Sequence, residues 1–250
     1  MTITREEAIR RVAADLFWCD MARRPQDRTE LTVDGANSLL ISCLVNRGIP
    51  WRKAMSLVDQ MKQRTGYTDT LRMFTELTPP MIEFVMFDDD GAGGGSLHRF
   101  RYIADYCYRA MCRVRDNYAG SALNLWEDEP TGRTLLERIC EFKGMGIKCS
   151  SLFVRIAVLS NGVVLWDKYA GLEVSPDVRV CRVMQRLGLV GADSTPQEVV
   201  KKAREMSPQC AVEIDGLWEV GSWCKASSPT CRRDEEGEPC PLLRLCPSAR

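Results

Sequence analysis

Apolar residues recur at helical spacing along most of this chain, and this pattern limits the possible folds more than any other feature. No convincing run alternates strictly between apolar and polar residues, and the only strand candidate is the segment at 162–166. Spacing with a period near 3.6 predicts amphipathic helices, whereas a half-buried strand would show strict alternation. The sequence therefore predicts an all-α fold. Apolar-periodic stretches lie near 35–45, 52–62, 70–76, 80–87, 97–114, 148–159 and 178–187.

Three Thr-x-x-Glu patterns predict where helices begin. They start at Thr4, Thr134 and Thr195. In such a capping box the threonine hydroxyl accepts a hydrogen bond from the backbone N–H three residues on. The glutamate carboxylate in turn accepts one from the backbone N–H of the threonine. Pro196 strengthens the third pattern, because proline fits the first helical position. We expect helices to begin directly after these threonines.

Bulk charge gives no sign of a nucleic-acid partner, because 34 basic residues balance 34 acidic ones. A nucleic-acid surface on this chain must therefore be local. The N-terminus MTITREEAIRR lacks the apolar region of a secretion signal, and no apolar run is long enough to cross a bilayer. We expect an intracellular protein without a membrane partner, which would be cytoplasmic and nucleoid-associated in a prokaryote.

Four of the twelve cysteines gather near the C-terminus, at Cys224, Cys231, Cys240 and Cys246. In a large chain without a secretion signal, reduced thiols or metal ligands are favoured over disulfides. Four thiolates suit a tetrahedral zinc ion or a four-iron cluster. Zinc ligands usually come in closely spaced pairs, and this tail has none. The wide spacing therefore favours iron–sulfur over zinc.

The segment FKGMGIK at 142–148 interrupts a helical pattern with two glycines. Gly144 and Gly146 can adopt positive φ and allow a tight turn between a helix that ends near Phe142 and one that begins near Ile147. Glycines and a helix N-terminus let backbone N–H groups approach a phosphate. The segment predicts a helix-hairpin-helix that binds the sugar–phosphate backbone, with an ordinary αα-hairpin as the alternative.

Two further residues, Lys148 and Asp177, are candidates for chemistry. A lysine in the first helical turn is electrostatically unfavourable, because the helix N-terminus is already positive. The same field, with partial burial, favours the neutral and nucleophilic amine; a solvated lysine that contacts phosphate is the alternative. Asp177 precedes a helical stretch and fits an N-cap, where an ionised carboxylate can face a developing cation.

This order of motifs, followed by LWEVGSWC and the four cysteines, resembles the helix-hairpin-helix DNA glycosylase superfamily. The pattern is most similar to the endonuclease III-like members that carry a four-iron cluster, and it is specific from about residue 134 to 246. The resemblance implies two helical domains that flank a DNA-binding cleft. The implied division is a six-helix barrel domain with the hairpin at 34–163, and a cluster domain formed by 1–33 and 164–250.

The resemblance also implies roles for single residues. Lys148 matches the family's Schiff-base lysine, and Asp177 matches its essential aspartate. Gly144 and Gly146 match the phosphate-binding hairpin. Leu44 falls in the segment at 40–50, where the family fills the hole left by a flipped base and where endonuclease III has a glutamine. Candidate phosphate contacts are Lys143, Arg155, Arg179 and Arg182.

The four tail cysteines match the ligands of the family's 4Fe-4S cluster. They depart from the family pattern in one respect, because eight residues instead of two separate Cys231 from Cys240. This RRDEEGEP insertion carries more acidic than basic residues, so it is an unusual contact for DNA.

By resemblance, the chain is a base-excision DNA glycosylase with AP lyase activity. The implied partner is double-stranded DNA with a damaged, modified or abasic site, and we expect a monomer. Such an enzyme flips the target base out of the duplex, and Lys148 then attacks C1′ with assistance from Asp177. Two alternatives stay open: a monofunctional glycosylase in which water attacks, and a non-catalytic protein that recognises damaged DNA.

Overall fold

The computed structural model describes residues 3–23, 31–87, 96–224, 232–233 and 238–248. These residues form eleven α-helices, three short 3₁₀ helices and one pair of two-residue strands, so the predicted all-α class is confirmed. The expected strand at 162–166 is wrong, because Gly162 caps the preceding helix with a φ of 70° and the chain then runs into a turn. No helix within these ranges is long and apolar enough to span a membrane.

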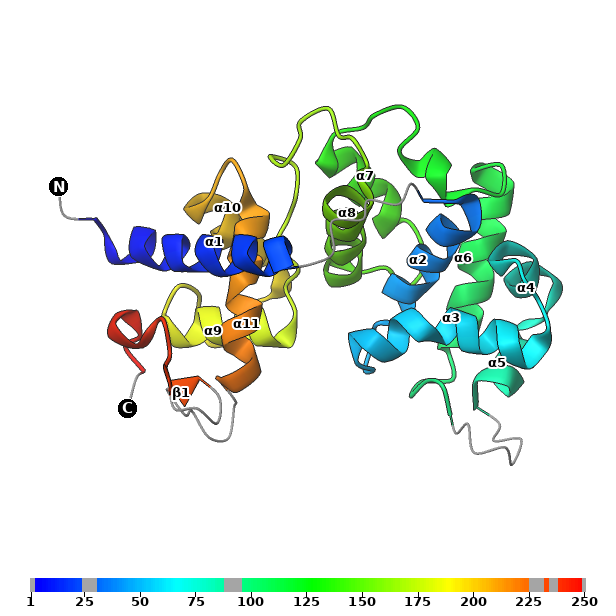
Figure 1. The fold of residues 1–250 in the computed structure, drawn as a ribbon, viewed down its shortest axis with the longest axis horizontal. Helices are drawn as coiled ribbons and strands as arrows, with labels where there is room; N and C mark the ends of the chain where they lie inside the picture. The colour runs from blue at the N-terminus through cyan, green and yellow to red at the C-terminus, as the bar shows by residue number, and fades with distance from the viewer. Residues whose placement is uncertain (1–2, 24–30, 88–95, 225–231, 234–237, 249–250) are drawn as a thin grey trace.

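The middle of the chain surrounds a first core, in which Phe74, Phe142 and Phe153 are fully buried. Its helices lie at the right and centre of Figure 1. Among the described residues, seven α-helices take part, and a proline pair at the start of α5 separates it from α4. They are α2 (Val33–Val45), α3 (Trp51–Thr65), α4 (Thr70–Glu76), α5 (Pro79–Phe87), α6 (Ile103–Asn117), α7 (Gly132–Cys140) and α8 (Ile147–Asn161), with the 3₁₀ helix η1 (Ala122–Leu125).

The two ends of the chain combine around a second core. Ile9 and Ala13 of the first helix pack there with Val180, Leu217 and Leu242. Both termini therefore lie at the same side of the molecule, at the left of Figure 1. The elements are α1 (Arg5–Arg23), α9 (Val178–Arg186), α10 (Pro196–Met206), η2 (Ala211–Gly216), α11 (Leu217–Trp223) and η3 (Leu243–Leu245), with strands β1 (Arg232–Arg233) and β2 (Glu238–Pro239).

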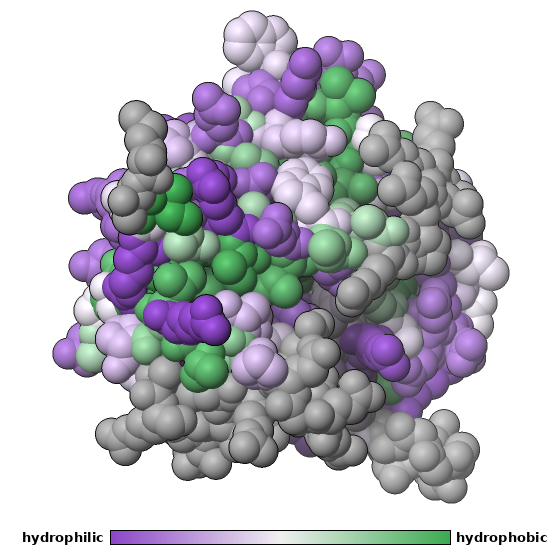
Figure 2. All heavy atoms as spheres, turned by 60° about the vertical axis from the view of Figure 1, so that its left-hand side comes forward, coloured by the Kyte–Doolittle hydropathy of each residue, from purple (hydrophilic) through white to green (hydrophobic). Residues whose placement is uncertain are grey.

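The two cores meet along α1. The division expected between residues 163 and 164 stays a prediction; Phe17 of α1 and Val212 of η2 pack in the first core. Gly216 approaches α1 so closely that a Cβ would overlap the carbonyl oxygen of Ala13. Figure 2 shows a band of apolar side chains between charged ones on the face that belongs mostly to the second core.

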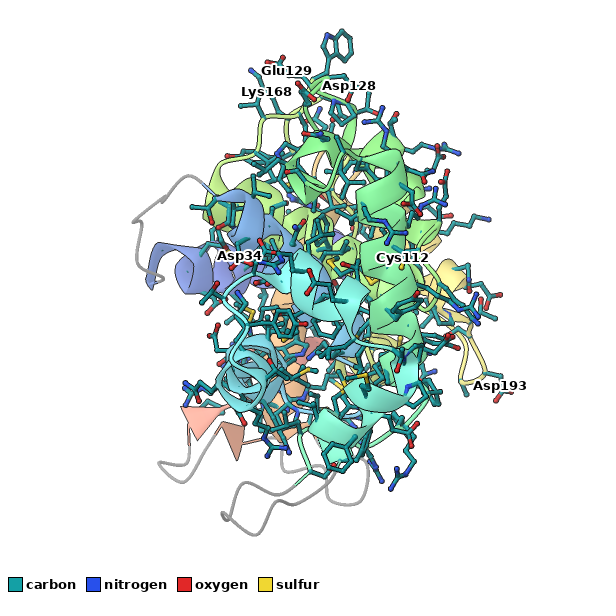
Figure 3. All side chains as sticks on the ribbon, turned by 90° about the vertical axis from the view of Figure 1, so that its right-hand side faces the viewer. Asp34, Cys112, Asp128, Glu129, Lys168 and Asp193 are labelled. Atoms are coloured by element: carbon teal, nitrogen blue, oxygen red, sulfur yellow. The ribbon has the colours of Figure 1, made fainter. Side chains whose placement is uncertain are left out.

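The connection before α7 and the connection after α8 lie side by side near the first core. The Trp166 N–H donates to the carbonyl oxygen of Pro130 at 3.2 Å, and the Gly132 N–H donates to Asp167 Oδ1 at 2.9 Å. Figure 3 accordingly shows Asp128, Glu129 and Lys168 together at one end of the molecule. The glycine-rich connection at 88–96 lies outside the described residues except for Ser96.

The capping patterns have three different outcomes. The complete capping box is present at Thr195. Thr4 accepts from the Glu7 N–H at 3.2 Å. The predicted start after Thr134 is wrong, because α7 begins earlier with Thr131 as its N-cap. Both threonines can accept a hydrogen bond at a helix start, and Thr131 follows Pro130, where the chain is still extended.

Candidate active site

A pocket of about 270 Å³ lies between the two cores. One wall comes from α8 and from the connection between α2 and α3, and the other comes from α1, α11 and the N-terminal end of α9. Lys148 and Asp177 line this pocket together, one from each core. The pocket also has an apolar part, formed by side chains that include Phe17, Trp51 and Leu152.

The hairpin next to the pocket depends on one glycine. Gly144 has a φ of 94°, and a Cβ there would overlap the ring of Tyr106. Gly146 has a φ of −79°, and a Cβ at that position would meet no heavy atom within 4 Å. The prediction of positive φ is therefore right for Gly144 and wrong for Gly146. The start of α8 at Ile147 agrees with the prediction, while α7 ends two residues before the expected Phe142.

Lys148 lies in the first turn of α8 and is half-buried. Its Nζ donates to the backbone oxygen and to Oδ1 of Asn46, both at 3.3 Å. Asn46 is itself 8% exposed and caps the end of α2. These contacts with neutral acceptors orient the amine in the pocket wall.

Asp177 is the N-cap of α9, as the sequence predicts. Its Oδ1 accepts from the backbone N–H groups of Arg179 and Val180 at 2.8 and 3.0 Å. Its Oδ2 accepts from the indole N–H of Trp218 at 2.9 Å. The guanidinium of Arg179 lies 4.4 Å from the ring centre of Trp218. Both carboxylate oxygens are thus held in fixed directions at the pocket.

Three polar residues close another part of the pocket. Arg155 forms an ion pair with Asp215, which is 4% exposed, and Asp215 Oδ1 accepts from the Ser175 N–H at 2.8 Å. Burial raises the pKa of Asp215 to about 6, against the lowering effects of Arg155 and the Ser175 N–H. Nothing in the sequence singled out Asp215 or Ser175, because they lie far from each other and from Arg155 along the chain.

The other predicted DNA contacts have varied positions. Leu44 is wrong as a surface contact, because it belongs to α2, is fully buried, and packs beneath Gly144. Arg182 donates to the backbone oxygen of Gly221 at 3.0 Å. Lys143 is exposed, pairs with Asp105 at 3.3 Å, and lies 5.3 Å from the ring centre of Tyr106.

An aromatic ladder beside the hairpin was missed in the sequence. Phe100 and Tyr102 stack with ring centres 5.4 Å apart, and Tyr106 follows at 5.3 Å from Tyr102. Tyr102 is 46% exposed. The ring of Tyr106 lies against Gly144, so the ladder adjoins the hairpin, and Arg47 donates to the backbone oxygen of Gly144 at 3.1 Å. Interleaved aromatic and basic residues in FRYIADY were the available signal, since such surfaces bind nucleic acid.

The described tail cysteines lie against the second core. Arg186 donates to Cys224 Sγ at 2.9 Å, and Cys246 Sγ donates to the backbone oxygen of Arg186 at 3.8 Å. Cys240 lies just before η3, and Cys231 falls outside the described residues. Within the part that is described, no three His, Cys, Asp or Glu side chains are grouped so that they could hold a metal ion. The predicted 4Fe-4S cluster stays a prediction.

Neither a protein-family model nor a curated protein sequence matches this chain. Among solved structures, it is similar to a non-covalent complex of endonuclease III with DNA, with a TM-score of 0.65 and 20% identity over 99% of this chain and 97% of that one. A trapped covalent intermediate of endonuclease III with DNA gives a TM-score of 0.63 and 20% identity, with 99% and 98% coverage.

A thermostable thymine-DNA glycosylase is similar as well, with a TM-score of 0.61 and 15% identity over 98% of this chain and 96% of that one. These similarities extend over both cores and the hairpin, since they cover nearly the whole chain. The chain therefore has the fold of endonuclease III and related helix-hairpin-helix glycosylases, as the sequence resemblance predicted.

Proposed function

We propose that this protein is a base-excision DNA glycosylase with associated AP lyase activity. One observation carries the proposal: Lys148 and Asp177 come from different cores and line the same pocket, directly beside a glycine hairpin. A nucleophilic amine and a carboxylate at one sugar are what this chemistry requires. The structurally similar endonuclease III has been trapped in a covalent intermediate with DNA, which supports an amine-based mechanism here.

The hairpin and its surroundings would hold the DNA backbone. The open space at Gly146 lies at the N-terminus of α8, where backbone N–H groups and the helix dipole favour a phosphate. Exposed Lys143 adds a positive charge next to it. The aromatic ladder offers Tyr102 as a stacking surface for a base. None of these contacts reads sequence, which suits a protein that searches DNA for rare sites.

In the chemical step, the target nucleotide leaves the duplex and its base enters the pocket. The amine nitrogen of Lys148 attacks C1′, so that an N–C1′ bond forms while the bond to the base breaks. The departing base takes the electron pair and then a proton. Asp177 faces the positive charge that develops on the sugar and accepts a proton from the attacking nitrogen. The sugar ring then opens: the C1′–O4′ bond breaks, O4′ takes the proton held by Asp177, and a Schiff base forms between Lys148 and C1′. Loss of a C2′ proton lets the 3′ phosphate leave by β-elimination, which cuts the strand on the 3′ side.

Trapping with borohydride tests this proposal. Duplexes that each carry one damaged, modified or abasic nucleotide are incubated with protein and reductant, and base release, strand nicking and the covalent adduct are measured. Lys148→Ala should abolish the adduct, because no other lysine among the described residues lines the pocket. Lys202→Ala is the matched control: Lys202 is also half-buried and pairs with Glu6 at 2.8 Å on the second core, and its loss should leave the adduct intact. An adduct that persists in Lys148→Ala overturns the assigned nucleophile.

A cofactor is a separate proposal. The donors present are thiols: Cys224 Sγ accepts from the Arg186 side chain and Cys246 Sγ donates to the Arg186 backbone oxygen, so both lie against the end of α9. The described cysteines do not by themselves form a three-ligand group, so the full set requires Cys231. We propose that Cys224, Cys231, Cys240 and Cys246 hold a 4Fe-4S cluster. Its contribution is structural, because it would fix the tail against α9 and α11, and no step of base excision needs a change of its charge.

A further inference from the structure

The polar end of the pocket contains a buried hydroxyl without a partner. Ser175 is 7% exposed, and its Oγ has no hydrogen-bond partner among the described residues. Ser175 also lines the pocket. A buried hydroxyl that is left unsatisfied costs about 1–3 kcal/mol, so its position favours a ligand that supplies the missing bond.

Arg155 offers further unused donors at the same place. Its guanidinium has five N–H donors, and among the described residues it pairs only with Asp215. The side chain keeps 19% exposure and lines the pocket. Asp215 links α8 to the segment before α9, because its carboxylate accepts hydrogen bonds from the Arg155 side chain and from the Ser175 backbone N–H. The remaining guanidinium donors and the Ser175 hydroxyl are left for a bound molecule.

The distance along α8 between Lys148 and Arg155 suits a single nucleoside, with its sugar near Lys148 and its base near Arg155. Arg155 follows Lys148 by seven residues on the same helix, and both line the pocket. Seven residues rise by about 10 Å, so an amine near the sugar would leave Arg155 near the far edge of the base. Leu152 and Ile156 lie on the same helix and provide apolar contact in the pocket.

We propose that Arg155 and Ser175 form a base-recognition subsite, which selects pyrimidines with a carbonyl group at position 4 over those with an amino group. This inference rests on the proposed glycosylase function. An arginine only donates hydrogen bonds, so it fits the O4 carbonyl and opposes an N4 amino group, which also donates. The Ser175 hydroxyl can accept from the neighbouring N3–H of the same base. The substrate class is therefore uracil- and thymine-type bases, including their oxidised forms.

A matched pair of substrates tests the subsite: duplexes with 5-hydroxyuracil or 5-hydroxycytosine opposite the same guanine, which differ at position 4 and in the ring N3–H that accompanies it. Wild-type protein should release 5-hydroxyuracil with a kcat/KM at least about tenfold higher, since one correct base contact discriminates by about 1–3 kcal/mol. Ser175→Ala removes only the hydroxyl and should lower kcat/KM for 5-hydroxyuracil about fivefold. Arg155→Met should lower it about 10- to 100-fold and bring the ratio of the two substrates close to one.

Affinity for a duplex with a tetrahydrofuran abasic analogue is the control, because that duplex has no base to recognise. Ser175→Ala should bind it within about threefold of wild type, because the Ser175 hydroxyl has no partner among the described residues. The subsite is overturned if wild-type protein shows no preference, or if each variant loses the same factor on both bases and on the analogue. A wild-type protein that releases no base from any duplex overturns the proposed function instead. Ser175→Ala keeps the test valid if Arg155→Met fails to fold.

Discussion

The carboxylate of Asp177 caps the first turn of α9 and lines the pocket at the same time. From the sequence alone, helix capping was enough to explain an aspartate at position 177. The structure adds a hydrogen bond from the indole N–H of Trp218 to its second carboxylate oxygen. That bond does nothing for the cap. It holds Oδ2 in a defined direction, and a group that must meet a short-lived positive charge gains from such fixed orientation.

The two roles of Asp177 can be separated by substitution. Asp177→Asn keeps a good N-cap but removes the negative charge, so the stability should stay within about 1 kcal/mol of wild type while the rate of base release falls at least about 100-fold. Asp177→Ala loses the cap as well and should cost about 1 kcal/mol. Urea unfolding and single-turnover kinetics measure the two effects. Full activity in Asp177→Asn would restrict this residue to capping.

At the scale of elements, the hairpin shows what the sequence could predict. The start of α8 followed from the glycines and from the helical pattern after them, and the structure confirms it at Ile147. The capping box of α10 was equally local and is confirmed at Thr195. Local signals work here because the partners lie within four residues. Where two local signals compete, as Thr131 and Thr134 do before α7, the sequence alone did not choose correctly.

Long-range packing decided the features that the sequence could not predict. The resemblance assigned Leu44 to a loop that fills the hole left by a flipped base, yet Leu44 belongs to α2 and packs beneath Gly144, which lies a hundred residues away. Asp215 pairs with Arg155 across sixty residues. Neither contact produces a periodic pattern of residues from which it could be predicted. Lys148 and Asp177 were singled out by local signals at two helix starts, and the family resemblance gave them a shared role; that they line one pocket is a long-range feature that neither local signal contains.

The hairpin glycines give a matched pair of substitutions. Gly144→Ala forces an alanine to a φ of 94° and its methyl group into the ring of Tyr106, so it should lower the free energy of unfolding by about 1–3 kcal/mol. Gly146→Ala has ordinary φ and open space, so the stability should change by less than about 1 kcal/mol. Its methyl group would lie where a phosphate is expected and should weaken duplex binding. Urea unfolding and fluorescence anisotropy check both effects; equal loss of stability would contradict this account of the turn.

At the scale of the whole molecule, the described tail cysteines Cys224, Cys240 and Cys246 pack against the second core. If a cluster occupies them, purified protein should be brown, with about four iron atoms per chain and visible absorption from the thiolate–iron bonds. Cys246→Ser should remove the colour. Cys140→Ser is the control, because Cys140 is exposed at the end of α7, outside the tail. Colourless protein with one zinc per chain would overturn the iron–sulfur proposal.

The return of α1 to the C-terminal part of the chain has a consequence for synthesis on the ribosome. The helix leaves the ribosome well before Leu217 and Leu242, which pack with Ile9 and Ala13 in the second core. In the pocket, α1 supplies Phe17 and α11 supplies Trp218. Lys148 therefore lies in an incomplete pocket until α11 has been made, and under the proposed function a nascent chain that lacks α11 should not cleave DNA.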